Sequence, residues 1–208
     1  MKVTEEILLY GAGGHARVVA ECLHCQERRI VAVFDDNPEV KRFGKMDVHH
    51  QYQRDLFAEH AILIGVGDNR LRRQLASRVY HPFADAARHR SAVISCRAEV
   101  GKGSMVMHQS TIQTGAFLGQ HVIVNTGAIV DHDCELEDFV HVGPGAVLCG
   151  NVSVGEGTLI GAGATVAPGV RIGFWAKIGA GAVVVRDIPD GVVVTGVPGR
   201  VIRKLETL

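Results

Sequence analysis

The second half of the sequence repeats with a period of six residues. An isoleucine, valine or leucine occupies every sixth position from Ile94 to Val184. Glycine often follows this aliphatic residue, and the residue four positions after it is nearly always small, as at Ala98, Ala128 and Ala164. An amphipathic helix has a period of 3.6 residues and an alternating strand a period of two, so neither explains the pattern.

A six-residue period predicts a solenoid of short parallel β-strands. Each repeat points one aliphatic and one small residue inward, and glycine takes the turn conformations that a side chain would penalise. Three repeats close a triangular coil, so residues 94–188 are expected to form about five coils. Such a prism has flat faces that self-association commonly buries, and we therefore expect a homotrimer. Residues 189–208 break the period and are expected to cap the last coil.

The first half begins with the order of a nucleotide-binding unit. Residues 7–10 (ILLY) are expected to form a strand, 11–16 (GAGGHA) a turn and 17–27 a helix, and a second strand ends at Asp35 and Asp36. In such units glycines let the backbone approach the ligand, the helix amino end favours a phosphate, and the acid holds a ribose or base. The alternative is a tight packing turn without a ligand.

This first domain is short. A third strand at 61–67 and a helix at 68–79 complete a Rossmann-like βαβαβ domain at residues 1–80, and 81–93 connect it to the solenoid. This is half of a dinucleotide fold, with room for one nucleotide, which argues against a dehydrogenase. The predicted fold is therefore an α/β mononucleotide domain followed by an all-β solenoid.

Composition excludes several classes of partner. The formal net charge is zero, so no basic surplus predicts binding to nucleic acid. No apolar run approaches the roughly 20 residues of a membrane helix, and Glu5 and Glu6 precede a short apolar run that does not match an export signal. Five cysteines form an odd, scattered set, as expected of reduced thiols. We expect a cytoplasmic protein without membrane insertion.

Motifs along nearly the whole chain carry a family resemblance: YGAGGHA, FDD, IGVGDN, VNTGAIVDHDC, HVGPGA, CGNV, IGAGA and GVP. Together they closely resemble the PglD-type and NeuD-type hexapeptide acetyltransferases of bacterial nucleotide-sugar pathways. The resemblance implies a left-handed β-helix, acetyl-CoA as cosubstrate, a nucleotide-sugar substrate and no metal.

The resemblance also implies roles for individual residues. His132 corresponds to the general base and Asp133 to the acid that raises its basicity, although the familiar members have glutamate there. His141 corresponds to a histidine that contacts acetyl-CoA. Main-chain positions of the coenzyme groove correspond to Gly150, Ala162 and Ala180. Nucleotide-sugar contacts correspond to Gly13, Gly14, His15, Asp35, Asp36, Gly67 and Arg70.

Acetyl transfer from a thioester is consistent with these residue types. A histidine titrates near neutral pH and can remove a proton from an amine or hydroxyl, and a carboxylate on its far nitrogen fixes the tautomer. A donor such as His141 or a backbone N–H would stabilise the oxyanion. Because the thioester is already activated, we expect direct transfer in a ternary complex without metal or covalent intermediate.

Other functions remain open at the level of sequence. His132 is a solvated turn residue in one alternative. His108 and His121, expected at a surface or interface, would suit a zinc enzyme similar to γ-type carbonic anhydrase, with three histidines between subunits. A non-catalytic sugar-nucleotide sensor is a third class. For the acetyltransferase, the favoured acceptor is a UDP- or GDP-linked 4-amino-4,6-dideoxyhexose, and the alternative is O-acetylation of sialic acid or its CMP form.

Overall fold

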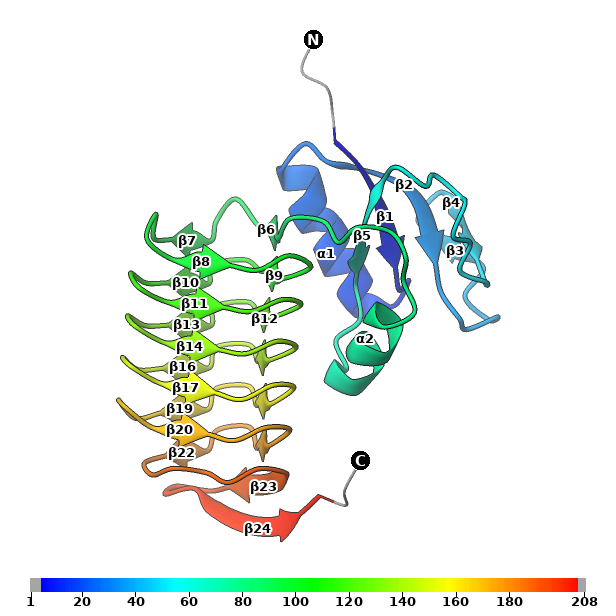
Figure 1. Ribbon diagram of the computed structural model, residues 1–208. Coiled ribbons are helices and arrows are strands. Elements are labelled where there is room, and N and C mark those ends of the chain that lie inside the picture. Colours follow the sequence, from blue (N-terminus) through cyan, green and yellow to red (C-terminus); the bar gives the residue numbers. More distant parts are fainter. Residues whose placement is uncertain (1–4, 206–208) are drawn as a thin grey trace.

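The computed structural model describes residues 5–205 and consists of a small α/β domain beside a long solenoid (Figure 1). The α/β domain lies against the upper coils, with both of its helices on the side that faces the solenoid (Figure 1). Within the described range, no helix has both the length and the apolar character needed to cross a bilayer.

A parallel sheet forms the centre of the N-terminal domain, as the sequence predicts. Its five strands have the order β3-β4-β2-β1-β5, and the pairs β1–β2, β1–β5 and β2–β4 are parallel. The elements are β1 (Glu6–Tyr10), α1 (Gly14–Cys25), β2 (Arg29–Phe34), β3 (Arg42–Phe43), β4 (Met46–His49), β5 (Ala61–Ile64) and α2 (Asn69–Ala76).

Several details of this domain differ from the expectation. Strand β5 ends at Ile64 rather than at residue 67, and α2 spans Asn69–Ala76 rather than 68–79. Helix α1 begins at Gly14 rather than at residue 17, because Gly13 already serves as its N-cap. The segment after Asp36 contains the antiparallel pair β3–β4, which was not foreseen. These strands are short and carry as many polar as apolar residues, and β4 is held by pairing with β2, so local sequence carried little signal for them.

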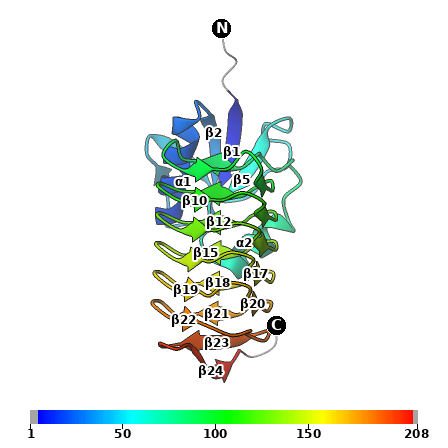
Figure 2. The ribbon, with the colours of Figure 1, turned by 90° about the vertical axis from the view of Figure 1, so that its left-hand side faces the viewer.

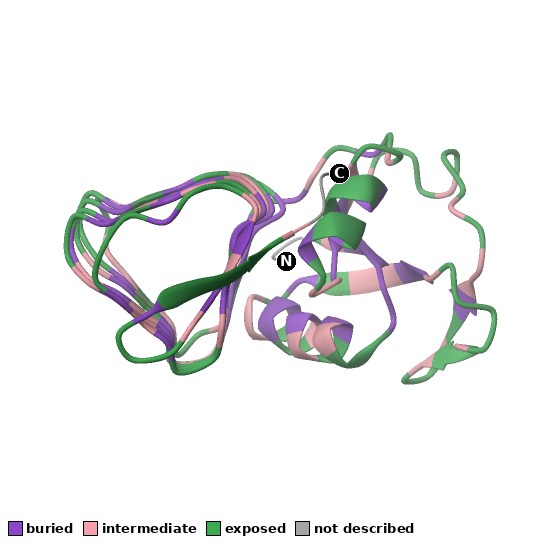
Figure 3. Cartoon of the chain, turned by 90° about the horizontal axis from the view of Figure 1, so that it is seen from below, coloured by how far each residue is buried: buried purple, intermediate pink, exposed green. Residues whose placement is uncertain are grey.

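The solenoid consists of two-residue strands that pair with the strands one coil away. The pairing joins residues eighteen apart, as Thr111 with Ile129 and Ile129 with Val147, which confirms three repeats per coil. The expected left-handed parallel β-helix is confirmed. Seen along its axis, the solenoid is a three-sided prism (Figure 3).

Three sheets form the sides of this prism, and each is named here by one strand. The β9 sheet contains β6 (Ala87–Arg88), β9 (Met105–Val106), β12 (Ile123–Val124), β15 (His141–Val142), β18 (Leu159–Ile160), β21 (Lys177–Ile178), β23 (Val192–Thr195) and β24 (Arg200–Lys204). The β10 sheet contains β7 (Val93–Ile94), β10 (Thr111–Ile112), β13 (Ile129–Val130), β16 (Val147–Leu148), β19 (Thr165–Val166) and β22 (Val183–Val184). The β11 sheet contains β8 (Glu99–Val100), β11 (Phe117–Leu118), β14 (Glu135–Leu136), β17 (Ser153–Val154) and β20 (Arg171–Ile172).

The repeated aliphatic residues fill the interior of the prism. From Val106 to Val184 they are buried and form one cluster with small residues such as Ala128 and Ala164. The ladder of the β9 sheet starts at Ala87, ahead of Ile94, because β6 pairs with β9. At the other end β23 pairs with β21, and β24 folds back antiparallel on β23, so the chain closes the last coil (Figure 2).

Side chains at the three edges of the prism stack in columns eighteen residues apart. The β9/β10 edge includes His108, Thr126, Pro144, Ala162 and Ala180, and the β10/β11 edge includes Thr114, His132, Gly150 and Pro168. The β11/β9 edge includes Gly103, His121, Phe139, Gly157 and Trp175. These names for the edges are used below.

Helix α2 docks on the β11/β9 edge through a fully buried arginine. Arg72 donates to the carbonyl oxygens of His121 (3.0 Å) and Phe139 (2.9 Å) in the solenoid. It also donates to the Val66 and Gly67 carbonyls at 2.9 and 3.2 Å. One guanidinium therefore ties the loop after β5 to two successive coils.

Candidate active site

His132 lies on the β10/β11 edge with its neighbour Asp133. The His132 Nδ1 is 2.9 Å from Oδ2 of Asp133, and the backbone N–H of His132 donates to Oδ1 of Asp131 at 2.8 Å. These carboxylates raise the pKa of His132, chiefly through the Asp133 hydrogen bond and then through the charge of Asp131. With Nδ1–H donated to Asp133, the free lone pair of neutral His132 lies on Nε2, which is the arrangement a general base needs.

Gly150 lies one coil below His132 and makes room for its ring. A Cβ at Gly150 would lie 2.5 Å from Cε1 of His132 and closer still to Nε2. Gly115, one coil above Asp133, has φ +72°, and a Cβ there would overlap the Asp133 carboxylate. The sequence-predicted base, acid and groove glycine are therefore neighbours at one edge, and the base and its acid are each more than half exposed, at 55% and 65%.

His141 lies elsewhere, in the β9 sheet beneath the N-terminal domain. Its Nδ1 is 3.2 Å from the Gly67 carbonyl oxygen and its Nε2 is 3.1 Å from Nδ2 of Asn125. Burial, followed by the charge of Arg72, lowers the pKa of His141 to about 4. The ring is therefore neutral at pH 7, with its proton on Nδ1. In this arrangement both nitrogens are engaged by the protein, so His141 offers no free donor to an oxyanion.

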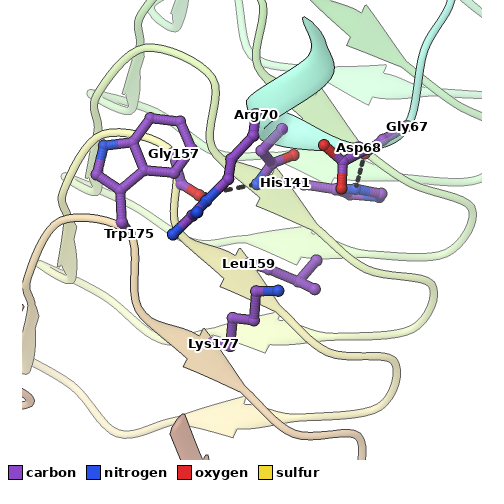
Figure 4. Close-up of a pocket in the computed structure, with 9 residues that line it drawn as sticks. Gly67, Asp68, Arg70, His141, Gly157, Leu159, Trp175 and Lys177 are labelled. Carbon is purple, nitrogen blue, oxygen red and sulfur yellow. Dashed lines mark hydrogen bonds between the residues drawn. The ribbon is translucent and has the colours of Figure 1, made fainter. Parts of the chain in front are cut away.

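A pocket of about 220 Å³ opens between the start of α2 and the β9 sheet (Figure 4). His141 and Leu159 lie on its solenoid side, and Gly67 and Arg70 on its α2 side. Trp175 and Lys177 also line it. Arg70, which the resemblance assigned to the substrate, lies with its guanidinium 5.9 Å from the Trp175 ring centroid. Two cations and an aromatic face suit an anionic ligand with a planar group.

The glycine turn has the geometry of a phosphate site. Gly13 is the N-cap of α1 without a side-chain cap, and no acid lies in the first turn, so backbone N–H groups are free to bind an anion. A Cβ at Gly13 or Gly14 would meet open space. His15 follows, and its ring centroid is 6.2 Å from that of His141. The turn therefore connects the first domain to the pocket.

Asp35 and Asp36 lie beside this turn but already have protein partners. Asp35 accepts from the Ala12 backbone N–H at 2.7 Å and from Asn37 N–H at 2.9 Å. Asp36 accepts from the Tyr10 hydroxyl at 2.6 Å. Both acids and Tyr10 line a second pocket of about 180 Å³ that continues to Leu71 and Leu75. Asp35 thus holds the turn in place and also lines this pocket.

One chain does not bring the predicted residues together in one place. His132, Asp133 and Gly150 share the β10/β11 edge, whereas Ala162 and Ala180 occupy the β9/β10 edge. His15, Gly67, Arg70 and His141 gather between the N-terminal domain and the β9 sheet, and Gly13 and Gly14 directly precede His15 at the start of α1.

Comparison with known proteins identifies the family. Residues 6–79 match the PglD N-terminal domain and residues 151–186 match the bacterial transferase hexapeptide repeats. PerB from Caulobacter crescentus, solved in complex with CoA and GDP-perosamine, is 37% identical with a TM-score of 0.88, over 97% of this chain and 99% of that chain. The chain belongs to the PglD-type family of acetyltransferases.

Two further PglD-type relatives agree with this assignment. The acetyltransferase domain of PglB from Neisseria gonorrhoeae, in complex with acetyl coenzyme A, is 34% identical with a TM-score of 0.86, over 96% of this chain and 100% of that chain. UDP-N-acetylbacillosamine N-acetyltransferase from Bacillus subtilis is 38% identical over 111 residues, and this match spans 50% of the chain and 51% of the relative.

Sequence reasoning missed several residues of this PglD-type site. Arg72 was hidden because α2 carries three arginines in four positions, and only docking on solenoid carbonyls decides which one is buried. Lys177 and Asn125 occupy outward positions of the repeats, where the residue type changes from one repeat to the next and gives no signal. Trp175 did carry a signal, because a tryptophan is unusual among small edge residues.

Proposed function

We propose that this PglD-type chain transfers the acetyl group of acetyl-CoA to the amine of a nucleoside-diphosphate-linked 4-amino sugar. The observation that carries the proposal is the oriented pair of His132 and Asp133 over Gly150. The nucleotide-type turn with its adjoining pocket gives the acceptor's nucleotide a place on the first domain. Two relatives support this proposal. PerB was solved in complex with GDP-perosamine, and the B. subtilis enzyme is named for UDP-N-acetylbacillosamine.

The chemistry needs only groups of the chain and the two substrates. The amine attacks the thioester carbonyl, a C–N bond forms, and the C–S bond breaks with release of the coenzyme thiolate. Nε2 of His132 takes the proton from the amine, and Asp133 stabilises the resulting imidazolium through Nδ1–H. Since His141 is engaged at both nitrogens, we assign the oxyanion donor to a backbone N–H at the edge of the groove.

We propose that the working enzyme is a homotrimer whose copies share each site. The outward residues of the β10 sheet form a ladder that is aliphatic apart from Thr111 and Thr165, and in it Val93 is 65% and Ile129 is 37% exposed. The N-terminal domain covers the upper β9 sheet and leaves this ladder uncovered. Burying it against a second copy would bring the β10/β11 edge of one copy toward the β9/β10 edge of the next. His132 of one copy would then complete the His141 pocket of its neighbour.

Thiol release from acetyl-CoA, measured with UDP- and GDP-linked 4-amino sugars and CMP-sialic acid, tests the reaction. We expect turnover with an amino sugar, and loss of turnover in His132→Ala with the oligomer intact. Near-normal turnover in that variant would refute the role of His132. Turnover with CMP-sialic acid alone would replace N-acetylation by O-acetylation.

Mixing two inactive variants tests the shared site. When His132→Ala and His141→Ala chains are coexpressed, mixed trimers contain interfaces in which both histidines are intact. We expect partial recovery of turnover in the mixture and none in either variant alone. An absence of recovery with mixed trimers shown by mass spectrometry would place each site within one chain.

A cytoplasmic location is part of the proposal, because all five cysteines are free thiols.

A further inference from the structure

Two histidines and a glutamate meet at the seam between the N-terminal domain and the first coils. Glu21 lies on α1, His89 directly follows β6, and His108 lies on the β9/β10 edge. One ligand atom from each residue lies within 4.8 Å of the other two. The rings of His89 and His108 are stacked, with centroids 3.6 Å apart, and Nε2 of His108 is 3.5 Å from Oε2 of Glu21.

We propose that Glu21, His89 and His108 bind a divalent transition metal, with zinc the best match. Two imidazoles and a carboxylate are a set that zinc accepts, with water in the remaining position. In a tetrahedral site with bonds of about 2.0–2.1 Å, neighbouring ligand atoms are about 3.4 Å apart. The His108–Glu21 pair already has nearly this separation. Because a metal lies in the ring plane of each imidazole that binds it, the stacked rings of His89 and His108 must also turn apart to close the site.

Ser91 holds the ring of His89 from the Nδ1 side. Its Nδ1 is 2.7 Å from the Ser91 hydroxyl, which also accepts from the backbone N–H of Gln109 at 3.0 Å. The backbone N–H of Ser91 also donates to Nδ1 at 3.2 Å, so Nδ1 is an acceptor in this arrangement and the proton of the neutral ring lies on Nε2. Ligation through Nε2 moves that proton to Nδ1, where the Ser91 hydroxyl oxygen can accept it as an outer hydrogen-bond partner.

The proposed ion is structural and takes no part in acetyl transfer. The cluster lies on the β9/β10 edge at the first coils, away from the β10/β11 edge that carries His132. Its three ligands come from α1, from the strand that joins the domains and from the solenoid. A bound ion would therefore fix α1, and with it the glycine turn at its amino end, to the coils beneath.

The site differs from the zinc centre considered for γ-type carbonic anhydrase. His121, the other histidine of that alternative, lies on the β11/β9 edge between Phe83 and Phe139, with ring centroids 4.3 and 5.0 Å away. It is therefore on a different edge from His108, and the two cannot share an ion within one chain.

Zinc binding to the full-length protein, with any affinity tag removed and metals stripped by a chelator, tests the proposal. By calorimetry we expect one Zn²⁺ per chain, and by thermal denaturation a rise in Tm that saturates at the same ratio. Co²⁺ in place of Zn²⁺ should give visible absorption typical of a four-coordinate site. The variants His108→Gln and Glu21→Gln should lose stoichiometric binding, and Ser91→Ala should weaken it about 10-fold or more.

The control is His24→Gln, which removes a histidine from the same helix outside the cluster. It should bind zinc as the wild type does. Turnover should be equal with and without the metal. Wild-type protein without one equivalent of bound zinc, or equal binding in His108→Gln, would overturn the site. Loss of turnover on metal removal would overturn its structural role.

Discussion

Replacing Gly150 by alanine should displace the base without weakening the fold. The added Cβ would lie 2.5 Å from Cε1 of His132, and the three nearest atoms that it meets all belong to that side chain. Because the His132 side chain is 55% exposed, it can rotate outward. The backbone of Gly150 does not have a positive φ, so alanine is accommodated there without strain. We expect stability within about 1 kcal/mol of the wild type.

The effect on turnover should be much larger. Moving a general base by about 1 Å costs about 100-fold, and its complete loss costs about 10²–10⁴-fold. We therefore expect kcat of Gly150→Ala to fall at least about 100-fold, while the Tm and the oligomeric state remain unchanged. The assay is thiol release at saturating acetyl-CoA, with KM for the coenzyme measured separately.

Two comparisons make the reasoning refutable. Gly101→Ala would place its Cβ 2.5 Å from the Gly119 carbonyl oxygen, so it should cost about 1–3 kcal/mol of stability and leave His132 in place. In a His132→Ala background, Gly150→Ala should have no further effect on kcat, because the group it displaces is gone. If the effects of the two changes on kcat instead multiply, or if only KM for acetyl-CoA rises, Gly150 acts on the coenzyme. Displacement of His132 would then be the wrong explanation.

Three further predictions concern a side chain of the site and two side chains at the boundary between the N-terminal domain and the solenoid. Asp133→Asn removes the main cause of the raised pKa of His132, so the acidic limb of the kcat/KM profile should move to lower pH while the plateau falls, and an unmoved limb would assign that titration to another group. His121→Phe replaces a ring whose pKa is lowered to about 4 by burial and by Arg72. Because this histidine is held neutral in the fold, its contribution to the free energy of unfolding is present above about pH 6.5 and is lost toward pH 4. Between pH 7 and pH 5 the variant should therefore lose about 2 kcal/mol less unfolding free energy than the wild type in denaturant titrations, and an equal loss would exclude His121 as a cause. Arg72→Met leaves the carbonyls of Val66, His121 and Phe139 without their side-chain donor, whereas the Gly67 carbonyl keeps His141. The change should cost about 3 kcal/mol or more, with faster proteolysis of the connector, and wild-type stability would show that α2 docks by other contacts.

Sequence periodicity was sufficient to predict the core of the solenoid but not its edges. The aliphatic positions repeat because every coil buries the same point of the chain, which is a local rule. Edge side chains obey the eighteen-residue stacking between coils. This rule could also have been applied, because large residues at edges have a glycine one coil away: His132 with Gly150, His121 with Gly103 and Trp175 with Gly157. In each pair the glycine gives the ring its space.

The buried position of Arg72 could not be predicted in this way. The α2 sequence NRLRRQLA shows an amphipathic pattern with arginines at three positions. Only Arg72 is fully buried, because the carbonyls of His121 and Phe139 stand opposite it across the domain boundary. Those partners are 49 and 67 residues away in sequence. Such contacts depend on how two folded units dock, and neither local propensity nor period contains this information.

The spacing of His132 and His141 leads from the fold to the proposed assembly. The two residues are nine positions apart, which is half of an eighteen-residue coil, so one chain places them on different sides of the prism. Both were assigned to acetyl transfer, and a single prism cannot bring both to one thioester. Either one of them acts outside the reaction, or neighbouring copies supply them to a common groove. The uncovered ladder of Val93 and Ile129 on the intervening β10 sheet favours the second explanation, because a copy packed there faces both edges at once.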